Sequence, residues 1–204
     1  MTNTLMRRTV LVGMMAGLGG CATLTSLNDA AKPLDTYDLR PASGSKQGRS
    51  TQRTLLVAVP QASAALTSDR IMIKPDPASI TYLPDVRWSD ELPAVVQLLI
   101  IRSVADTGRV GYVGRSGAGP VPDTALLVRI DTFEVIARGE DIFEVAVDLD
   151  LTLINDREQS VVATRRFSGS KQSASDQPAV IVAQFQSLLN ELLPEMSDWA
   201  IQRL

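Results

Sequence analysis

Histidine is absent from the 204-residue chain, and cysteine occurs only once, as Cys21. Without histidine, the chain cannot build a Ser-His-Asp triad, a histidine general base or a histidine-based zinc site. One cysteine cannot support an internal disulfide framework. No acid–base pair in the sequence is suited to catalysis. We therefore predict that the protein is not an enzyme and has no cofactor or metal.

Basic residues are also too few to mark a nucleic-acid-binding protein. Lysine and arginine number 20 against 23 acidic residues, and only four of the basic residues are lysines. Arg7 and Arg8 lie in a predicted leader; once it is removed, 18 basic residues face 23 acidic ones, a net charge of −5. An acidic domain lacks the electrostatic footprint that binding to nucleic acid requires.

The N-terminal 20 residues have the layout of a secretory signal. Two arginines precede an uncharged run of 12 residues from Thr9 to Gly20. This run is too short to span a membrane, which takes about 20 apolar residues. The segment Leu18-Gly19-Gly20-Cys21 resembles the lipobox of bacterial lipoproteins, in which the cysteine is lipidated and becomes the new N-terminus. We predict cleavage between Gly20 and Cys21; the alternative is an ordinary secretory signal with a chance cysteine.

A lipidated Cys21 would carry a diacylglycerol group and an N-acyl chain, more than the two signals that give stable membrane attachment. Residues 21–33 are then an acylated tether, and residues 34–204 suit a single domain. Ala22 follows the cysteine where lipoproteins retained in the inner membrane often carry Asp. It therefore resembles the pattern that directs lipoproteins to the outer membrane.

The periodicity of the remaining chain predicts an α/β protein of the α+β type. Apolar and polar side chains alternate along residues 142–154, so the apolar ones from Phe143 to Leu153 share one face and the polar ones share the other. This pattern is typical of an antiparallel sheet with one solvent-exposed face. Helices are predicted at about 90–106, capped by Asp90, and at 177–202, kinked at Pro194. We expect a mostly antiparallel sheet with one face covered by these two helices.

A cluster of carboxylates is predicted on the polar face of the sheet. Glu144, Asp148 and Asp150 project from one strand, and Asp131 could lie across from them. Such a cluster can bind calcium or share protons. However, Arg129, Arg165 and Arg166 are available as partners on neighbouring strands. We therefore favour an ion-paired, solvated face over a metal site.

Tyr82, Arg87 and Trp88 gather just before the first helix and form a candidate partner-binding patch, because these residue types are enriched in binding hot spots. The alternative is that Trp88 plugs the end of the core. The glycine-rich stretch from Gly108 to Pro120 lacks the Lys-Ser/Thr pair and the following helix of a phosphate-binding loop. It is interpreted as a short strand and a loop.

The layout resembles the auxiliary lipoproteins of ABC-type transport systems that work with MCE-domain proteins, the PqiC-like family. The resemblance covers nearly the whole chain. Its pieces are the segment ending at Cys21, Tyr37-Asp38-Leu39, Leu55 to Pro60, Ile80-Thr81-Tyr82, Arg87-Trp88, Pro93 with its helix, and the helix from Asp176 to Trp199.

This resemblance implies a lipid-anchored component on the periplasmic face of the outer membrane. It would dock to an MCE protein that carries phospholipid or another hydrophobic molecule across the periplasm, with a permease and a separate ATPase as further partners. It also implies a homo-oligomeric ring. A second interpretation is an envelope-assembly or cell-wall accessory lipoprotein that takes no part in transport.

Overall fold

The computed structural model describes residues 33–117, 119–139 and 142–204, and residues Leu34–Leu204 form one compact unit. The predicted leader, the cleavage site at Gly20 and Cys21, and the tether up to Lys32 lie outside the described residues. Ala118, Glu140 and Asp141 also lie outside the described residues.

Three long antiparallel strands form one side of the sheet, with the last of them at its edge: β7 (Thr124–Gly139), β8 (Ile142–Asn155) and β9 (Ser160–Ser173). The alternation in β8 is confirmed, because Val145, Val147, Leu149, Leu151 and Leu153 are all buried on one face. Successive side chains of a strand point to opposite faces, so this pattern fixes which face meets the core. The other face is called the outer face below.

Short strands line the second edge of β7. The strands β2 (Thr51–Val57), β3 (Gln61–Ala62) and β4 (Arg70–Lys74) pair with successive stretches of β7, all in parallel. Beyond them lie β6 (Val110–Arg115), parallel to β2, and β5 (Thr81–Trp88), antiparallel to β4; β1 (Asp35–Tyr37) runs parallel to β5.

The expectation of a mostly antiparallel sheet is therefore wrong, although the α+β class fits. Five of the eight strand pairings are parallel, and the sheet is mixed. The reason is topological. The chain advances along one edge of β7 through β2, β3 and β4, and then crosses over through a helix before β6 and β7. Hydrophobic alternation identifies a half-buried strand but carries no information on the direction of its neighbour.

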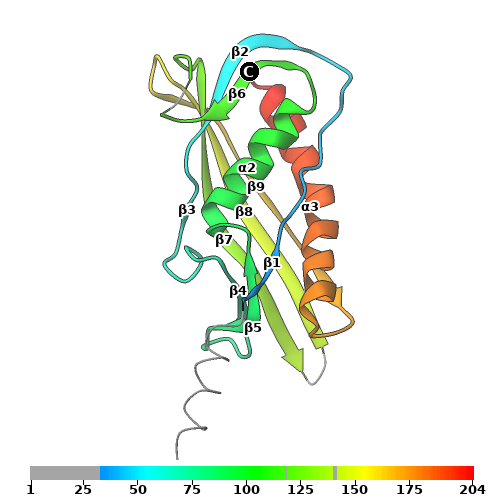
Figure 1. Cartoon of the computed structure of the whole chain (residues 1–204). Coiled ribbons are helices and arrows are strands. Elements are labelled where there is room, and N and C mark those ends of the chain that lie inside the picture. The colour runs from blue at the N-terminus through cyan, green and yellow to red at the C-terminus, as the bar shows by residue number, and fades with distance from the viewer. Residues whose placement is uncertain (1–32, 118, 140–141) are drawn as a thin grey trace, which may run out of the picture. The chain divides into compact units, whose positions relative to one another are not determined.

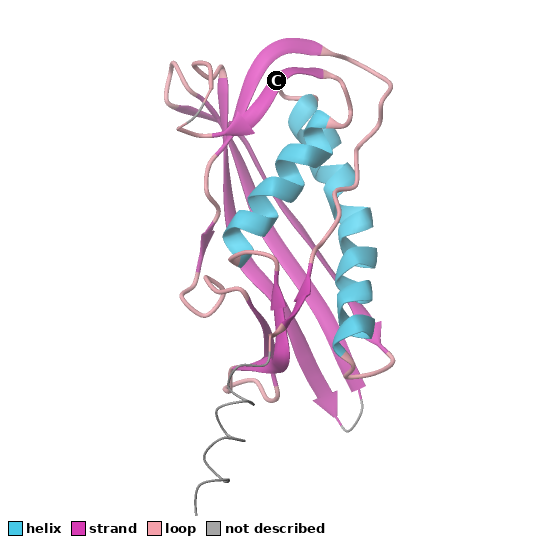
Figure 2. Ribbon diagram, in the orientation of Figure 1, coloured by secondary structure: helices cyan, strands magenta, loops and turns pink. Residues whose placement is uncertain are grey.

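Two helices cover the inner face of the sheet (Figures 1 and 2): α2 (Leu92–Ala105) and α3 (Pro178–Ile201). Both positions were predicted, and a proline stands in the first turn of each, where its missing N–H is not needed. The N-caps are Glu91 and Gln177 without side-chain cap bonds, so the expectation that Asp90 caps the first helix is wrong. Gly108 lies shortly after α2 and has the left-handed conformation that favours glycine, with φ +67°.

The part of α3 that meets the sheet is an apolar face whose positions are spaced three and four residues apart in the sequence. Its members are all buried: Ile181, Phe185, Leu188, Leu189, Leu192, Met196 and Trp199. The helix continues through Pro194 to Ile201, and the Ser197 hydroxyl donates to the carbonyl of Leu193 at 2.8 Å. Burying side chains of this size contributes about 1.5–3 kcal/mol each, so this face provides most of the attachment of α3.

Candidate functional site

Trp88, one of the three residues of the predicted partner patch, belongs to the core. Only 2% of the residue is exposed, and its ring meets Phe133 and Phe185 edge-on, at centroid distances of 5.9 and 5.4 Å. Phe133 and Phe185 stack on each other at 4.8 Å. The alternative interpretation, in which Trp88 fills the end of the core, is the one observed.

The other two residues of the patch are separated by a bulge in β5. Asp85 has φ +56°, an uncommon conformation for a residue other than glycine, and the pairing of β4 with β5 is shifted across this point. Tyr82 is half-buried, and its hydroxyl donates to the carbonyl of Ala65 at 3.1 Å. Arg87 lies beyond the bulge, so Tyr82 and Arg87 face different depressions of the surface.

Arg87 is held at the edge of a polar hollow of about 510 Å³. Its Nε donates to the hydroxyl of Thr36 at 3.2 Å, and its Nη1 lies 3.6 Å from a carboxylate oxygen of Asp69. The side chain is nevertheless 47% exposed. Asp90 and Glu91, just before α2, also line the hollow. The arginine is thus fixed in orientation while part of it faces solvent.

The predicted carboxylate cluster is an ion-paired face, as favoured from the sequence. Arg129 makes two hydrogen bonds to Asp131, at 2.7 and 2.9 Å, and lies 3.7 Å from Asp150. Arg166 pairs with both carboxylate oxygens of Asp148. Within the described residues, no group of His, Cys, Asp or Glu could hold a metal ion.

The pairing shifts the acid–base equilibria of this face. The hydrogen bond from Arg129 holds the pKa of Asp131 below its usual value and raises the pKa of Arg129. A hydrogen bond from Ser170, followed by one from Arg138, lowers the pKa of Glu144. These carboxylates therefore stay ionised at neutral pH, which suits neither a general acid nor a shared proton.

Arg165 was expected to pair on this outer face, and that expectation is wrong. It contacts Glu195 of α3 and lies over the ring of Phe167, 4.7 Å from the centroid. Because α3 covers the inner side, Arg165 belongs to the helix-covered side of the sheet. Its neighbour Arg166 points to the outer face, as the alternation of a strand requires.

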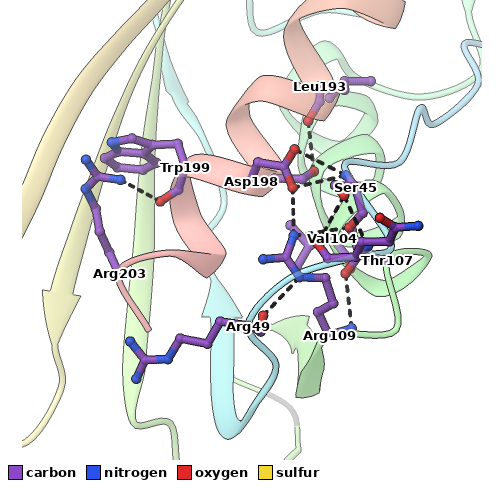
Figure 3. A network of polar contacts seen from close by, with 11 residues as sticks. Ser45, Arg49, Val104, Thr107, Arg109, Leu193, Asp198, Trp199 and Arg203 are labelled. Carbon is purple, nitrogen blue, oxygen red and sulfur yellow. Dashed lines mark hydrogen bonds and ion pairs between the residues drawn. The ribbon is translucent and has the colours of Figure 1, made fainter.

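A polar clamp that the sequence analysis missed joins segments far apart in the chain (Figure 3). Arg109, which is 6% exposed, donates from Nη1 to Asp198 of α3 at 2.9 Å and from Nε to the carbonyl of Arg49 at 3.0 Å. The carboxylate of Asp198 also accepts the backbone N–H of Ser45 at 3.0 Å. The clamp ties the connection between β1 and β2 to α3. Gly44 lies tightly against the clamp, because a Cβ there would lie 2.8 Å from Asp198 Oδ1 and 3.0 Å from the carbonyl oxygen of Pro194.

The glycine-rich stretch also has a structural explanation. It supplies β6, as expected, and a Cβ on Gly111 would lie 2.5 Å from the carbonyl oxygen of Gln52 on β2. Glycine therefore permits the close approach of the two strands. No helix in the described part of the chain is long and apolar enough to cross a membrane.

Comparison with known proteins identifies the class to which this chain belongs. Residues 37–197 match the family described as the ABC-type transport auxiliary lipoprotein component. The chain therefore belongs to this family, which is a family of transport accessory lipoproteins rather than of enzymes.

One curated protein and two solved structures show the likeness in more detail. An uncharacterized protein of Bradyrhizobium diazoefficiens is 26% identical over 195 residues, covering 94% of this chain and 50% of that protein. The chain thus spans about half the length of this curated relative. A crystal structure of a Xanthomonas campestris protein superposes with a TM-score of 0.74 at 23% identity, covering 82% of this chain and 95% of that one. A crystal structure of an uncharacterized protein gives 0.63 at 14% identity, covering 84% and 99%. Both structural likenesses show the fold alone.

Proposed function

We propose that the protein is an outer-membrane-anchored component of an MCE-type ABC transport system. In this role it docks to the MCE protein that carries phospholipid or another hydrophobic small molecule across the periplasm. The observation that carries the proposal is the family match over residues 37–197, preceded in the same chain by a segment ending at Cys21 that resembles a lipobox. Transport energy comes from a separate ATPase, with a permease as further partner.

Lipidation at Cys21 supplies the attachment in this proposal. A diacylglycerol group and an N-acyl chain together bury more than enough methylenes for stable attachment, at about 0.8 kcal/mol each. Ala22 supports sorting to the outer membrane. The described domain then lies in the periplasm, next to the membrane, where it can bind the MCE protein. A homo-oligomeric ring stays a prediction, which the mass of the purified protein in solution tests.

Arg87 is the residue that we assign to partner contact. Its guanidinium is oriented by Asp69 and Thr36 before any partner binds, so little conformational entropy remains to be lost on docking. The hollow beside it can take a partner side chain. Arginines of this kind are frequent among residues whose truncation costs more than about 1 kcal/mol of binding free energy. Tyr82 stays a predicted contact on the neighbouring depression.

Affinity purification of the tagged, acylated protein from solubilised membranes tests the proposal. We expect an MCE-domain protein to be recovered, and recovery to fall about fivefold or more for Arg87→Ala. Arg53→Ala, which changes an exposed arginine of β2, serves as the matched control and should leave recovery unchanged. Recovery of cell-wall or outer-membrane assembly proteins without an MCE protein would favour the accessory-lipoprotein alternative and overturn the proposal.

A further inference from the structure

An apolar groove of about 470 Å³ opens at one end of the domain. Four different elements line it, mainly through Ile73 of β4, Tyr82, Leu83 and Pro84 of β5, Phe143 of β8 and Pro178 of α3; its polar lining residues are Thr81, Asp176 and Gln177. The hydroxyl of Tyr82 is satisfied by the carbonyl of Ala65, so the polar atom of this side chain needs no partner in the groove. The volume of the groove and its mainly apolar lining are typical of sites that bind apolar ligands.

Strand register brings two exposed isoleucines to the same end of the domain. Lys74, the last residue of β4, pairs with Ile136, and Phe143 pairs with Ala137. The loop after β4 and the start of β8 therefore lie together beside the end of β7. Ile80 in that loop is 51% exposed, and Ile142 at the start of β8 is 50% exposed. Large apolar side chains exposed together beside an apolar groove mark an interaction surface.

The chain also enters the domain at this end. Strand β1 begins with Asp35 beside Val86 and runs toward Trp88, so the start of β1 lies near Pro84, which lines the groove. Only 13 residues lie between Cys21 and Asp35, so these two residues are roughly 50 Å apart at most when the chain is fully extended. With lipidation at Cys21, as in the proposed function, the bilayer is held within this reach at a high effective concentration.

We propose that the groove binds one acyl chain of a bilayer phospholipid, with Ile80 and Ile142 entering the membrane surface at its rim. Asp76, Asp85 and Asp176 are exposed around this end. Of the cations nearby, Lys74 pairs with Glu134 at 2.9 Å and Arg138 pairs with Glu144 at 2.6 Å. Arg70 donates to the carbonyl of Leu83 at 3.0 Å. The exposed carboxylates would repel anionic lipids, so a zwitterionic lipid is the appropriate probe.

The test uses the full acylated protein in vesicles of phosphatidylcholine that contain a phosphatidylcholine with a photoreactive acyl chain. After irradiation, peptides carrying the lipid are mapped by mass spectrometry. We expect adducts on Tyr82, Leu83 or Phe143. We also expect Ile80→Ser combined with Ile142→Ser to lower their yield roughly fivefold or more, because half of each side chain is exposed and available for burial in lipid. Val161→Ser, 65% exposed at the opposite end of the sheet, is the control and should leave the yield unchanged.

Three results would overturn the inference. Adducts spread evenly over the surface would show no groove site. An empty adduct map from correctly acylated protein would mean that another occupant, such as the protein's own acyl chains or an apolar peptide, fills the groove. An equal loss of adduct yield for Val161→Ser would mean that Ile80 and Ile142 have no specific role in lipid binding. The intact mass, measured before reconstitution, reports separately whether Cys21 is acylated. The vesicles contain no MCE protein, so failure of that partnership leaves the adducts unchanged.

Discussion

Asp198→Asn is the substitution that tests the polar clamp most sharply. Asparagine keeps the shape and can still accept the backbone N–H of Ser45, but it leaves the buried guanidinium of Arg109 without its counter-charge. The Arg109 side chain is 7% exposed and that of Asp198 is 32% exposed. Removing one partner of a fully buried ion pair costs about 3–5 kcal/mol.

The expected cost here is smaller, because Asp198 is partly solvated and Arg109 keeps the carbonyls of Arg49 and Ser45 as acceptors. We expect the free energy of unfolding to fall by about 2 kcal/mol. For a domain of this size, that corresponds to a melting temperature lower by about 4–8 °C. Urea unfolding of the unacylated mature protein, followed by tryptophan fluorescence, measures the difference.

Glu195→Gln is the matched control, one turn earlier on the same helix. Glu195 pairs with Arg165, and their side chains are 52% and 43% exposed, so losing this pair should cost only about 0–0.5 kcal/mol. In an Arg109→Met background the effect of Asp198→Asn should largely disappear, because no buried cation remains. The reasoning would be refuted if Asp198→Asn cost no more than Glu195→Gln, or if its cost were unchanged in the Arg109→Met protein.

Three further predictions concern pH, strand packing and the core. The pKa values of Asp131 and Glu144 are lowered in the folded protein, so the stabilisation by their ionised forms is present above about pH 4 and is lost as pH falls further. In the double variant Asp131→Asn, Glu144→Gln, the melting temperature should therefore change less between about pH 5 and 3 than in the unmodified protein. An unchanged pH dependence of the melting temperature would contradict this. Gly111→Ala should destabilise by about 1–3 kcal/mol in urea unfolding, because the added methyl meets backbone, whereas Gly114→Ala meets a movable Tyr112 ring and should cost less. Trp88→Ala should lower the free energy of unfolding by about 3–5 kcal/mol, because Trp88 is a core residue. A variant that keeps the normal melting temperature but no longer recovers the MCE protein would overturn that assignment.

Helix α3 and strand β8 were predictable because each carries a sustained period. The apolar steps of three and four residues from Ile181 to Trp199 leave only one face for burial, and the alternation from Phe143 to Leu153 does the same for β8. Strand pairing direction was not predictable in the same way. Strands as short as β3, with two residues, have no period at all, and their parallel alignment with β7 is decided by how the chain returns along one edge.

The candidate site was only partly accessible from the sequence, for similar reasons. Tyr82, Arg87 and Trp88 were placed together because they are close in the sequence, just before the first helix. In the structure Trp88 points into the core while its neighbour Arg87 stays exposed, because adjacent side chains of a strand face opposite sides, and the bulge at Asp85 separates Tyr82 from both. Arg109 and Asp198 lie 89 residues apart, and no local pattern marks either as a partner of the other. The groove likewise arises from four elements that only the tertiary fold assembles.

The chemical state of Cys21 tests the central claim most directly, because both the proposed function and the lipid-binding groove depend on a membrane anchor at this residue. Mass spectrometry of the protein purified from fractionated cells should find Cys21 as the N-terminal residue, carrying a diacylglycerol group and an N-acyl chain, in the outer-membrane fraction. An unmodified N-terminus on protein recovered from the cytosol would contradict the account.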